Sequence, residues 1–301
     1  LNYWRPSAAF FIDSEIWPNT FINLSDKKIP LILLNARITK KTFNKWMLIN
    51  NFAHNIFKKI NLCLSSSIES EKYLKKLGAK NIKLIGNLKY SQSEKNVIKI
   101  NYKLKKFIGS KKTWCASSTH ASEEIFSGLV HKELKKKYKN LLTIIIPRHI
   151  NRIATVKEEL NNLNLKVHTH EPEKKIEKDT DIYLVNSYGQ TKSFYSNCRN
   201  VFLGGSIINH GGQNPLEATR YGCNILHGPN VSNFKEIYKH LKKMKISSQI
   251  SNKQMMVRKL ETILKKKSES QKIRKNLKKI GQKILNSTYT EIKFILKNNE
   301  V

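Results

Sequence analysis

Short apolar runs alternate with segments of helical periodicity along most of the chain. The runs are five to seven residues long, rich in β-branched and aromatic residues, and bounded by turn-forming residues. The segments between them repeat their apolar residues at every third or fourth position, which is the period of an amphipathic helix. Strands are predicted at residues 8–12, 30–36, 61–65, 82–86, 113–117, 141–147, 165–169, 181–185, 200–205 and 224–228.

Helices are predicted between these strands, most clearly over 39–57 and 67–78, and two further amphipathic helices are predicted over 251–301. Strands that alternate with helices favour a parallel sheet with crossover helices. The polar segment 90–103 lacks a strong apolar period and interrupts the series, so a linker is predicted there. We therefore expect an α/β protein with two Rossmann-like, doubly wound domains and no internal repeat.

The charge of the chain is extreme, but the residues that carry it are not typical of a nucleic-acid interface. The 56 Lys and Arg against 22 Asp and Glu give a net charge of +34, which attracts nucleic acid, anionic lipid and phosphorylated ligands. Only eight of the basic residues are Arg, the residue that binds phosphates and bases bidentately. Lys spread along the whole chain favours solvated helix faces, and no nucleic-acid partner is expected.

The cysteines and the apolar runs argue against a disulfide-rich protein and against a membrane-spanning one. Cys63, Cys115, Cys198 and Cys223 are far apart and have no His at ligand spacing, so we expect reduced, buried thiols in a cytoplasmic protein. No apolar run approaches the length of about 18 residues that a membrane span needs, and no signal peptide is visible. The chain starts on Leu1 and runs directly towards a strand, which indicates a fragment.

The densest group of glycines follows a predicted strand, in the segment GGSIINHGGQNPLEA (204–218). Glycine lets backbone N–H groups approach an anion, and a helix that begins after such a loop adds the positive end of its dipole. Asn214 is the expected N-cap and Pro215 the first helical residue. Glu217, in the first turn, is suited to bind ribose hydroxyls. Tight turns and a Glu that complements the helix dipole are an equally consistent alternative.

Two further groups of polar residues follow the strands before this one. Arg148, His149 and Arg152 come directly after the apolar strand 141–147, where arginines can clamp a phosphate or a carboxylate; a surface ion pair is the less favoured alternative. The segment SSTHASEE (117–124) predicts a helix start. Its Ser or Thr is the expected cap and one of its two Glu completes a capping box, while His120 remains a candidate pocket residue.

Polar residues also end three strands in the first third of the chain. Two carboxylates at the end of the first strand are candidates for general-base chemistry, with an ion pair to an adjacent Arg as the structural alternative. The residues at these three strand ends are Asp13, Ser14 and Glu15, then Asn35 and Arg37, and then Gly86, Asn87 and Lys89.

The familiar loops of nucleotide enzymes are missing. The chain has no G-x-x-x-x-G-K-[ST] loop, no G-x-G-x-x-G fingerprint, no G-x-S-x-G elbow and no H-E-x-x-H site. A nucleotide-handling enzyme without them, built from two facing α/β domains, suggests a two-domain glycosyltransferase. Neither a metal nor another cofactor is expected.

Several motifs together resemble a known family. The segments SEIWPN, NARIT, GNLKY, SSTHASEE, IIIPRH and FLGGSIINHGGQNPLEATRYGCNILHGPNVSNFKEI are similar, in order over about residues 8–240, to the 3-deoxy-D-manno-octulosonic acid (Kdo) transferases of lipopolysaccharide synthesis. The resemblance implies two Rossmann-like domains of the GT-B type. It places an incomplete acceptor-side domain at 1–92, a donor domain for the CMP-sugar at 93–285, and a C-terminal helix at 286–301 that packs back on the first domain.

The resemblance also assigns roles to residues. Arg148 would meet the phosphate of CMP-Kdo and Glu217 would hold its ribose, while Glu15 matches an acidic residue of the cleft. The remaining donor-side residues implied are His149, Gly204, Gly205, Ser206, His210, Gly211, Gly212 and Asn214. The acceptor-side residues implied are Asn35, Arg37, Asn87 and Lys89.

The chain departs from the family pattern in three places. Asp13-Ser14-Glu15 stands where the family has Glu-Thr-Glu, and Gln190 in the segment NSYGQT (186–191) replaces an acid. The family's Gly-Glu segment, which carries the favoured general base, and its membrane-associating amino terminus fall upstream of Leu1, as in an amino-terminally truncated member.

The sequence therefore predicts a metal-independent, inverting glycosyltransferase. The family transfers Kdo from CMP-Kdo to a lipid A precursor, lipid IVA, at the cytoplasmic face of the inner membrane, so the expected partners are the donor, this lipid and an anionic membrane surface. Two alternatives stay open: a two-domain glycosyltransferase with another nucleotide sugar, and an inactive basic fragment that binds membranes or nucleic acid.

Overall fold

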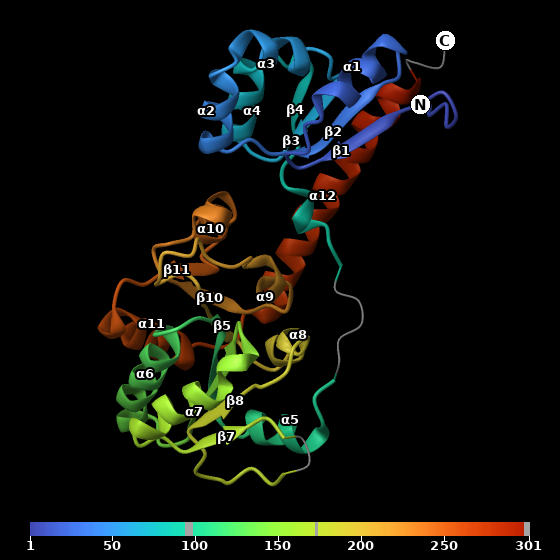
Figure 1. Ribbon diagram of the computed structural model, residues 1–301. Coiled ribbons are helices and arrows are strands. Elements are labelled where there is room, and N and C mark those ends of the chain that lie inside the picture. Colours follow the sequence, from blue (N-terminus) through green and yellow to red (C-terminus); the bar gives the residue numbers. More distant parts are fainter. Residues whose placement is uncertain (94–98, 172–173, 298–301) are drawn as a thin grey trace. The chain divides into compact units, whose positions relative to one another are not determined.

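The computed structural model describes residues 1–93, 99–171 and 174–297 (Figure 1). The chain divides into two compact units, Leu1–Ser93 with Lys278–Val301, and Glu94–Leu277. Each unit contains one sheet, and every strand pair within the two sheets is parallel. The predicted α/β fold class is confirmed. The domain boundaries predicted at residues 92/93 and 285/286 stay predictions.

The first unit has a four-stranded sheet in the order β1-β2-β3-β4. Its strands are β1 (Ala9–Ile12), β2 (Leu31–Ala36), β3 (Leu62–Ser65) and β4 (Ile82–Leu84). Its crossover helices are α1 (Pro18–Asp26), α2 (Lys40–Met47), α3 (Asn50–Phe57) and α4 (Ile68–Lys76). Each connection leads to the neighbouring strand, so the carboxyl ends of all four strands meet at one edge. Phe21, Leu33 and Phe57 are fully buried in the core of this unit.

The single helix predicted over 39–57 is wrong, because the structure contains two helices separated at Leu48 and Ile49. Ile49 has φ −124° and ψ 48°, which is outside the helical region. The burial of the two helices differs: α3 buries Ala53, Ile56 and Phe57, whereas α2 buries no residue completely. In one straight helix the buried side of α3 would continue along α2. Because α2 buries no residue completely, the chain changes direction between the two helices.

The last helix, α12 (Ser270–Lys297), has 28 residues, and its C-terminal part belongs to the first unit. Ile292 and Ile295 of this helix pack against Ile32, Leu62 and Leu64 of the sheet. With α11 (Lys253–Lys265), it confirms the two amphipathic helices predicted at the end of the chain.

The second unit has a seven-stranded sheet in the order β11-β10-β9-β5-β6-β8-β7. Its strands are β5 (Lys112–Thr119), β6 (Leu141–Pro147), β7 (Val167–Thr169), β8 (Ile182–Leu184), β9 (Asn200–Leu203), β10 (Asn224–His227) and β11 (Ser247–Gln249). The sequence predicted six of these. It missed β11, because this edge strand reads Ser-Ser-Gln and pairs only with β10, so it has no apolar run to mark it.

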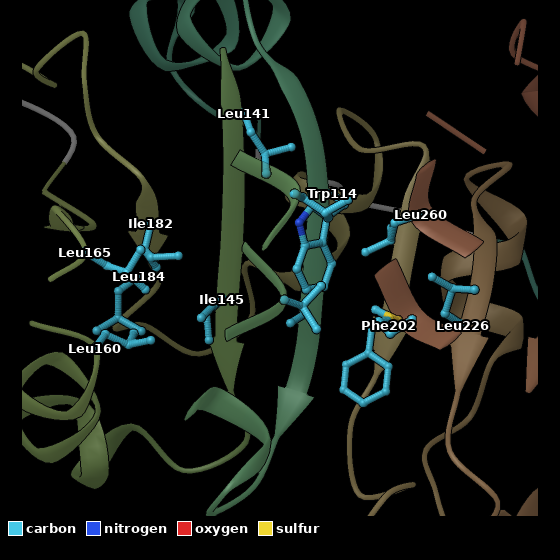
Figure 2. Packing of buried hydrophobic residues seen from close by; sticks show 14 of the residues in the cluster. Trp114, Leu141, Ile145, Leu160, Leu165, Ile182, Leu184, Phe202, Leu226 and Leu260 are labelled. Atoms are coloured by element: carbon cyan, nitrogen blue, oxygen red, sulfur yellow. The ribbon is translucent and has the colours of Figure 1, made fainter. Parts of the chain in front are cut away.

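The helices of this unit hold a large apolar core around the sheet. They are α5 (Tyr102–Gly109), α6 (Glu123–Lys137), α7 (Ile153–Asn162), α8 (Thr191–Tyr195), α9 (Leu216–Arg220), α10 (Lys235–Lys243) and α11. Figure 2 shows Trp114 of β5 among the apolar side chains of this core, with Ile145 on the neighbouring strand β6. Trp114 is the largest fully buried side chain described, and burying an aromatic ring of this size stabilises a fold strongly.

The direction of winding reverses in this sheet, which defines a doubly wound fold. From β5 the chain builds β6, β7 and β8 on one side, and then returns to place β9, β10 and β11 on the other side. The reversal lies between β5 and β9, and ligands of such sheets bind beyond the carboxyl ends of the strands at this point. The sheet order therefore selects the loops that follow β5 and β9.

Two smaller expectations concern the linker and the cysteines. The linker predicted at 90–103 includes residues 94–98, which lie outside the described residues; on either side are a short 3₁₀ helix, η1 (Leu88–Tyr90), and α5. The four cysteines are free and buried, as predicted. Burial raises the pKa of the Cys63 thiol to about 12, so this thiol is uncharged at neutral pH.

Candidate functional site

The loops after β5 and β9 meet at the point where the winding reverses. Residues 120–124 follow β5 and residues 204–212 follow β9. The N–H of Gly204 donates to the carbonyl of Ser117, near the end of β5, over 2.8 Å. The N–H of Arg148, after β6, donates to the carbonyl of Thr119 over 2.9 Å. The loops after three adjacent strands are therefore joined through their backbones.

The carboxylate of Glu123 organises these loops. Its Oε2 accepts the N–H of Gly205 over 2.6 Å and the N–H of His120 over 3.1 Å. Its Oε1 accepts the N–H groups of Ser206 and Ile207 over 3.1 and 3.0 Å. The side chain is completely buried, and a buried carboxylate needs such donors. A single side chain therefore binds four backbone N–H groups.

This arrangement corrects the role predicted for the glycine loop. We expected the backbone N–H groups of Gly204, Gly205 and Ser206 to be open to a phosphate, but all three donate within the protein. The Ser206 hydroxyl is also occupied, because it donates to the carbonyl of Leu203 and accepts the N–H of Gly228 over 2.8 Å. That these residues line a donor pocket stays a prediction.

The glycines are needed for close packing and for backbone conformation. A Cβ on Gly204 would lie 2.5 Å from the carbonyl oxygen of Ser118 and 2.7 Å from Glu123 Oε2. Gly205, Gly211 and Gly212 have φ of 63°, 97° and 76°, in the left-handed region that favours glycine. The tight-turn alternative weighed from the sequence thus accounts for their conformation.

The predicted capping box in 117–124 is wrong. α6 begins only at Glu123, its N-cap is Ser122 with φ 73°, and this residue makes no side-chain capping bond. Ser118, with φ 55°, continues the irregular end of β5 instead of capping the helix. The sequence marked Glu123 as an acid of the first helical turn, and no local signal shows that its partners follow a strand more than 80 residues later.

Three histidines lie together beside this loop. The rings of His120 and His210 are 4.3 Å apart, and the ring of His149 is 5.7 Å from that of His120. His149 and His210 are exposed, whereas His120 is only 8% exposed. Burial lowers the pKa of His120, the neighbouring rings of His210 and His149 lower it further, and the Glu123 carboxylate acts in the opposite direction.

The two arginines after β6 have different surroundings. Arg148 is exposed, and no hydrogen bond or ion pair of its side chain is found among residues 1–93, 99–171 and 174–297. The guanidinium of Arg152 lies 3.1 Å from Glu124 Oε1, and that carboxylate is completely buried. Burial raises the pKa of Glu124 and the cation of Arg152 lowers it. Arg152 thus compensates a buried charge, while Arg148 is accessible to a ligand.

Asn214 and Glu217 lie around the start of α9. The predicted helix start is wrong by one residue, because the N-cap is Pro215 and the first helical residue is Leu216. The Asn214 side chain still accepts the N–H of Leu216 over 3.1 Å. Glu217 is partly exposed and lies 3.9 Å from Lys192 Nζ. α9 has only five residues, so its dipole contributes little to binding an anion.

The polar residues of the first unit form a separate network at the carboxyl edge of its sheet. The amide of Asn35 donates to Asp13, and its oxygen accepts the N–H of Leu88 over 2.9 Å. Lys89 Nζ lies 3.5 Å from the Asp13 carboxylate. Asn35 is nearly buried, with φ 50°. These contacts join the loops after β1, β2 and β4.

The other predicted residues of this unit lie around the network. Glu15 is exposed and accepts a hydrogen bond from the Trp17 indole over 3.0 Å. The N–H of Arg37 donates to the carbonyl of Asp13 over 3.0 Å. The Asn87 side chain accepts the N–H of Lys89 over 2.9 Å and so shapes the turn that carries this lysine. Their proposed functional roles stay predictions.

None of the helices described is both long and apolar enough to cross a membrane. No group of three or more His, Cys, Asp or Glu in the described parts of the chain is placed to hold a metal ion.

Comparison with known families assigns the chain to a class. Residues 130–282 match the family described as glycosyl transferases group 1. The chain belongs to this family. Residues 1–92 match the family described as 3-deoxy-D-manno-octulosonic-acid transferase (kdotransferase), which confirms the resemblance seen in the sequence.

Individual relatives agree with these matches. A protein of Rickettsia bellii named 3-deoxy-D-manno-octulosonic acid transferase is 30% identical over 269 residues, which cover 88% of this chain and 63% of the relative. A protein of the same name from Haemophilus influenzae is 28% identical over 251 residues, covering 80% of this chain and 57% of the relative. The chain thus spans about 60% of the length of these relatives.

Solved structures support the fold. The C-terminal CMP-Kdo binding domain of WaaA from Acinetobacter baumannii is 26% identical, with a TM-score of 0.51 over 60% of this chain and 91% of that domain. UDP-GlcNAc 2-epimerase from Neisseria meningitidis has a TM-score of 0.60 over 97% of this chain and 77% of the epimerase, at 13% identity, so it bears on the fold alone. Together with the group 1 match, they confirm the predicted GT-B type fold.

Proposed function

We propose that the protein is a Kdo transferase, which moves Kdo from CMP-Kdo to a lipid A precursor such as lipid IVA. The observation that carries this proposal is the resemblance to proteins named Kdo transferase, which extends over 88% of the chain in the Rickettsia bellii relative. The similarity of the second unit to a CMP-Kdo binding domain supports CMP-Kdo as the donor.

The donor would bind beyond the carboxyl ends of β5 and β9. Arg148, exposed after β6, would meet the donor phosphate, and a guanidinium is well suited to this task. Glu217, partly exposed on α9, would accept hydrogen bonds from the ribose hydroxyls. His149 and His210 would border the same pocket, since both are exposed beside the glycine loop.

The proposed reaction is a direct displacement that inverts the anomeric carbon. A general base takes the proton of an acceptor hydroxyl, the oxygen forms a bond to the anomeric carbon, and the bond from that carbon to the CMP phosphate breaks. Arg148 would stabilise the charge that grows on the departing phosphate. Glu15 is the candidate carboxylate among the described residues. The reaction as proposed uses no metal or other cofactor.

The first unit would receive the acceptor. Lys89 and Arg37 supply cationic side chains near the carboxyl edge of its sheet, and Asn35 and Asn87 fix the loops that carry them. A lipid A precursor carries phosphate groups and sugar hydroxyls, so cations beside hydrogen-bonding amides suit it.

The turn between α2 and α3 would contact the membrane. Leu48 is 86% exposed and Phe52 is 45% exposed, and Lys40, Lys41 and Lys45 are exposed on α2. Apolar side chains that insert between lipids, next to lysines that attract anionic headgroups, favour binding to a membrane surface. We propose that this surface is the cytoplasmic face of the inner membrane.

Calorimetry with CMP tests the donor proposal. The chain is expected to bind CMP and to bind UMP at least about tenfold more weakly. Arg148→Ala and Glu217→Ala are each expected to lower the affinity for CMP about tenfold or more, because each removes a charge-assisted hydrogen bond. Binding of CMP and UMP with equal affinity would favour another nucleotide-sugar donor, and absence of binding would contradict the proposal.

Matched variants control for charge and folding. Arg199→Ala removes an exposed arginine just before β9, at the opposite end of that strand, and Glu158→Ala removes an exposed carboxylate from α7. Both controls are expected to bind CMP as the unmodified chain does. An equal loss in the controls would show that the net charge of the surface, and not the site, governs binding.

A further inference from the structure

His120 is buried without a hydrogen-bond partner. Its side chain is only 10% exposed, and neither ring nitrogen has a hydrogen-bond partner of ordinary length and angle among the described residues. The backbone of Ser118 lies close enough to raise the pKa of the ring, but not to satisfy it. Its Nδ1 is 3.8 Å from Glu123 Oε2, which is too far for a hydrogen bond. A neutral imidazole carries one donor and one acceptor, and leaving such groups buried and unpaired is unfavourable.

The other buried histidines of the same unit differ in this respect. His131 Nδ1 lies 2.8 Å from the Thr143 hydroxyl, and His170 Nδ1 lies 2.6 Å from the Tyr183 hydroxyl. His227 Nδ1 is 2.7 Å from the carbonyl of Gly228. The fold therefore gives each of these three buried rings a partner; in the half-buried His168 only Nε2 is buried without a partner, whereas in His120 both nitrogens are. The missing partner of His120 points to a group that comes from outside the chain.

The groups that face His120 favour an anion. His210 and His149 are its ring neighbours, and Arg148 is adjacent to His149 in the chain. Glu123 is the one carboxylate among the described groups that influence its titration. Both oxygens of Glu123 already accept backbone N–H groups, two each, so this charge is compensated locally.

The backbone around His120 is held in an unfavourable conformation. Ser118 and Ser122, two residues before and after it, have φ of 55° and 73°. A left-handed conformation is unfavourable for residues other than glycine, and such strain is common where a fold must orient a functional side chain. Here it directs the segment that carries both His120 and Glu123.

We propose that His120, with His149 and His210 beside it, forms an anion site at the switch point of the second sheet, where His120 donates a hydrogen bond to a phosphate or carboxylate group of the bound ligand. The inference rests on the proposed function insofar as a CMP-linked sugar acid carries both groups. His120 would then contact the ligand directly, and the three imidazoles together would select ligands that carry a negative charge.

The site should respond to pH in a defined direction. An anion beside His120 favours its protonated form and therefore raises its pKa on binding, so the site takes up a proton as it fills. Affinity for an anion whose own charge is constant should rise as the pH falls from about 7.5 to about 6. Sulfate has this property, whereas the phosphate of CMP itself titrates near pH 6.

Imidazole resonances of the full chain, observed by NMR, provide the test. Sulfate and CMP are expected to shift the signals of His120, and cytidine, which lacks the phosphate, is not. His120→Ala should weaken binding of sulfate and of CMP about tenfold or more. His120→Gln keeps an N–H donor but cannot titrate, so it should retain most of the affinity and lose the pH dependence. His168→Ala, on the edge strand β7, is the matched control and should change neither.

The outcomes separate this inference from the proposed function. If sulfate shifts His120 while CMP binds no better than UMP, the anion site stands and the CMP-Kdo donor is wrong. If CMP is preferred over UMP but no ligand shifts His120 and His120→Ala binds normally, the anion site is overturned and the donor stands. If neither sulfate nor CMP binds, both are overturned. Unchanged thermal midpoints of the variants exclude unfolding as the cause.

Discussion

Glu123 illustrates how one residue can define a loop. Its carboxylate accepts the N–H groups of His120, Gly205, Ser206 and Ile207 within a completely buried environment. These donors compensate the negative charge, and in return the charge fixes the loops that follow β5 and β9. The glycine-rich segment thus owes its shape to an internal anion, irrespective of any ligand.

Replacement of this carboxylate should be strongly destabilising. Glu123→Gln puts an amide N–H₂ group against backbone N–H groups, so buried donors lose their acceptor, and a loss of about 2–4 kcal/mol in the free energy of unfolding is expected. Urea-induced unfolding measures this change. Glu133→Gln on the same helix removes only an exposed pair with Lys136 and should change stability by less than about 0.5 kcal/mol. Equal stability of the two variants would refute the role assigned to Glu123.

At the scale of elements, hydrophobic periodicity predicted those helices and strands whose position is determined by local sequence. Ten of the strands follow from their apolar runs, and the two terminal helices follow from their amphipathic repeat. The break between α2 and α3 does not, because Leu48 and Ile49 continue the apolar pattern although they are exposed. The place of this break depends on the packing of Ala53 and Phe57 in the core of the first unit, and a local sequence pattern does not show such tertiary contacts.

The exposed turn between α2 and α3 leads to a prediction about membranes. Leu48→Asp and Phe52→Asp should each lower binding to vesicles that contain phosphatidylglycerol about tenfold, because each replaces apolar area that would enter the lipid with a charge. Co-sedimentation with the vesicles measures it. Tyr289→Asp, an aromatic on α12 whose exposed fraction of 65% lies between those of Leu48 and Phe52, is the control and should bind as the unmodified chain does. If all three variants bind alike, lysines alone hold the protein on the surface.

At the scale of the whole molecule, the meeting of the loops after β5, β6 and β9 was predictable from the sequence, but the contacts between them were not. Arg148, His210 and Glu217 were selected because they follow strands, and parallel strands bring such positions to one edge of a sheet. The four bonds to Glu123 and the missing partner of His120 depend on the meeting of loops that are distant in the sequence. Residue types and spacing do not contain this information.

Buried histidines should make the stability of the molecule depend on pH. Burial and the cation of Lys135 lower the pKa of His131 to about 3. The Asp181 carboxylate, 3.2 Å from His131 Nε2, acts in the opposite direction but is also paired with Lys135. An unfolded histidine titrates near 6.5. Between these values the unfolded chain binds a proton that the folded chain does not, so stability is lost as the pH falls below about 6.5. The loss for this group is about 1.4 kcal/mol per pH unit.

Urea unfolding at about pH 7.5 and about pH 5 measures this dependence. The free energy of unfolding should be lower at the acidic pH, and His131→Gln should show a smaller difference between the two, whatever its absolute stability. Burial also lowers the pKa of His170 and His227, so the variant should keep part of the dependence. A difference as large in His131→Gln as in the unmodified chain would contradict the assignment.

The hydrogen bonds to Glu123 also affect two measurable properties of the glycine-rich loop. One is the rate at which its amide hydrogens exchange with solvent, and the other is the conformational entropy that the loop loses when a ligand binds. The amide hydrogens of Gly205, Ser206 and Ile207 are bonded internally, so they should exchange slowly with deuterium before any ligand is added. A ligand that meets a loop already ordered loses less conformational entropy on binding than one that must order it. The enthalpy of binding should then come from the contacts between ligand and protein, without a contribution from folding of the loop.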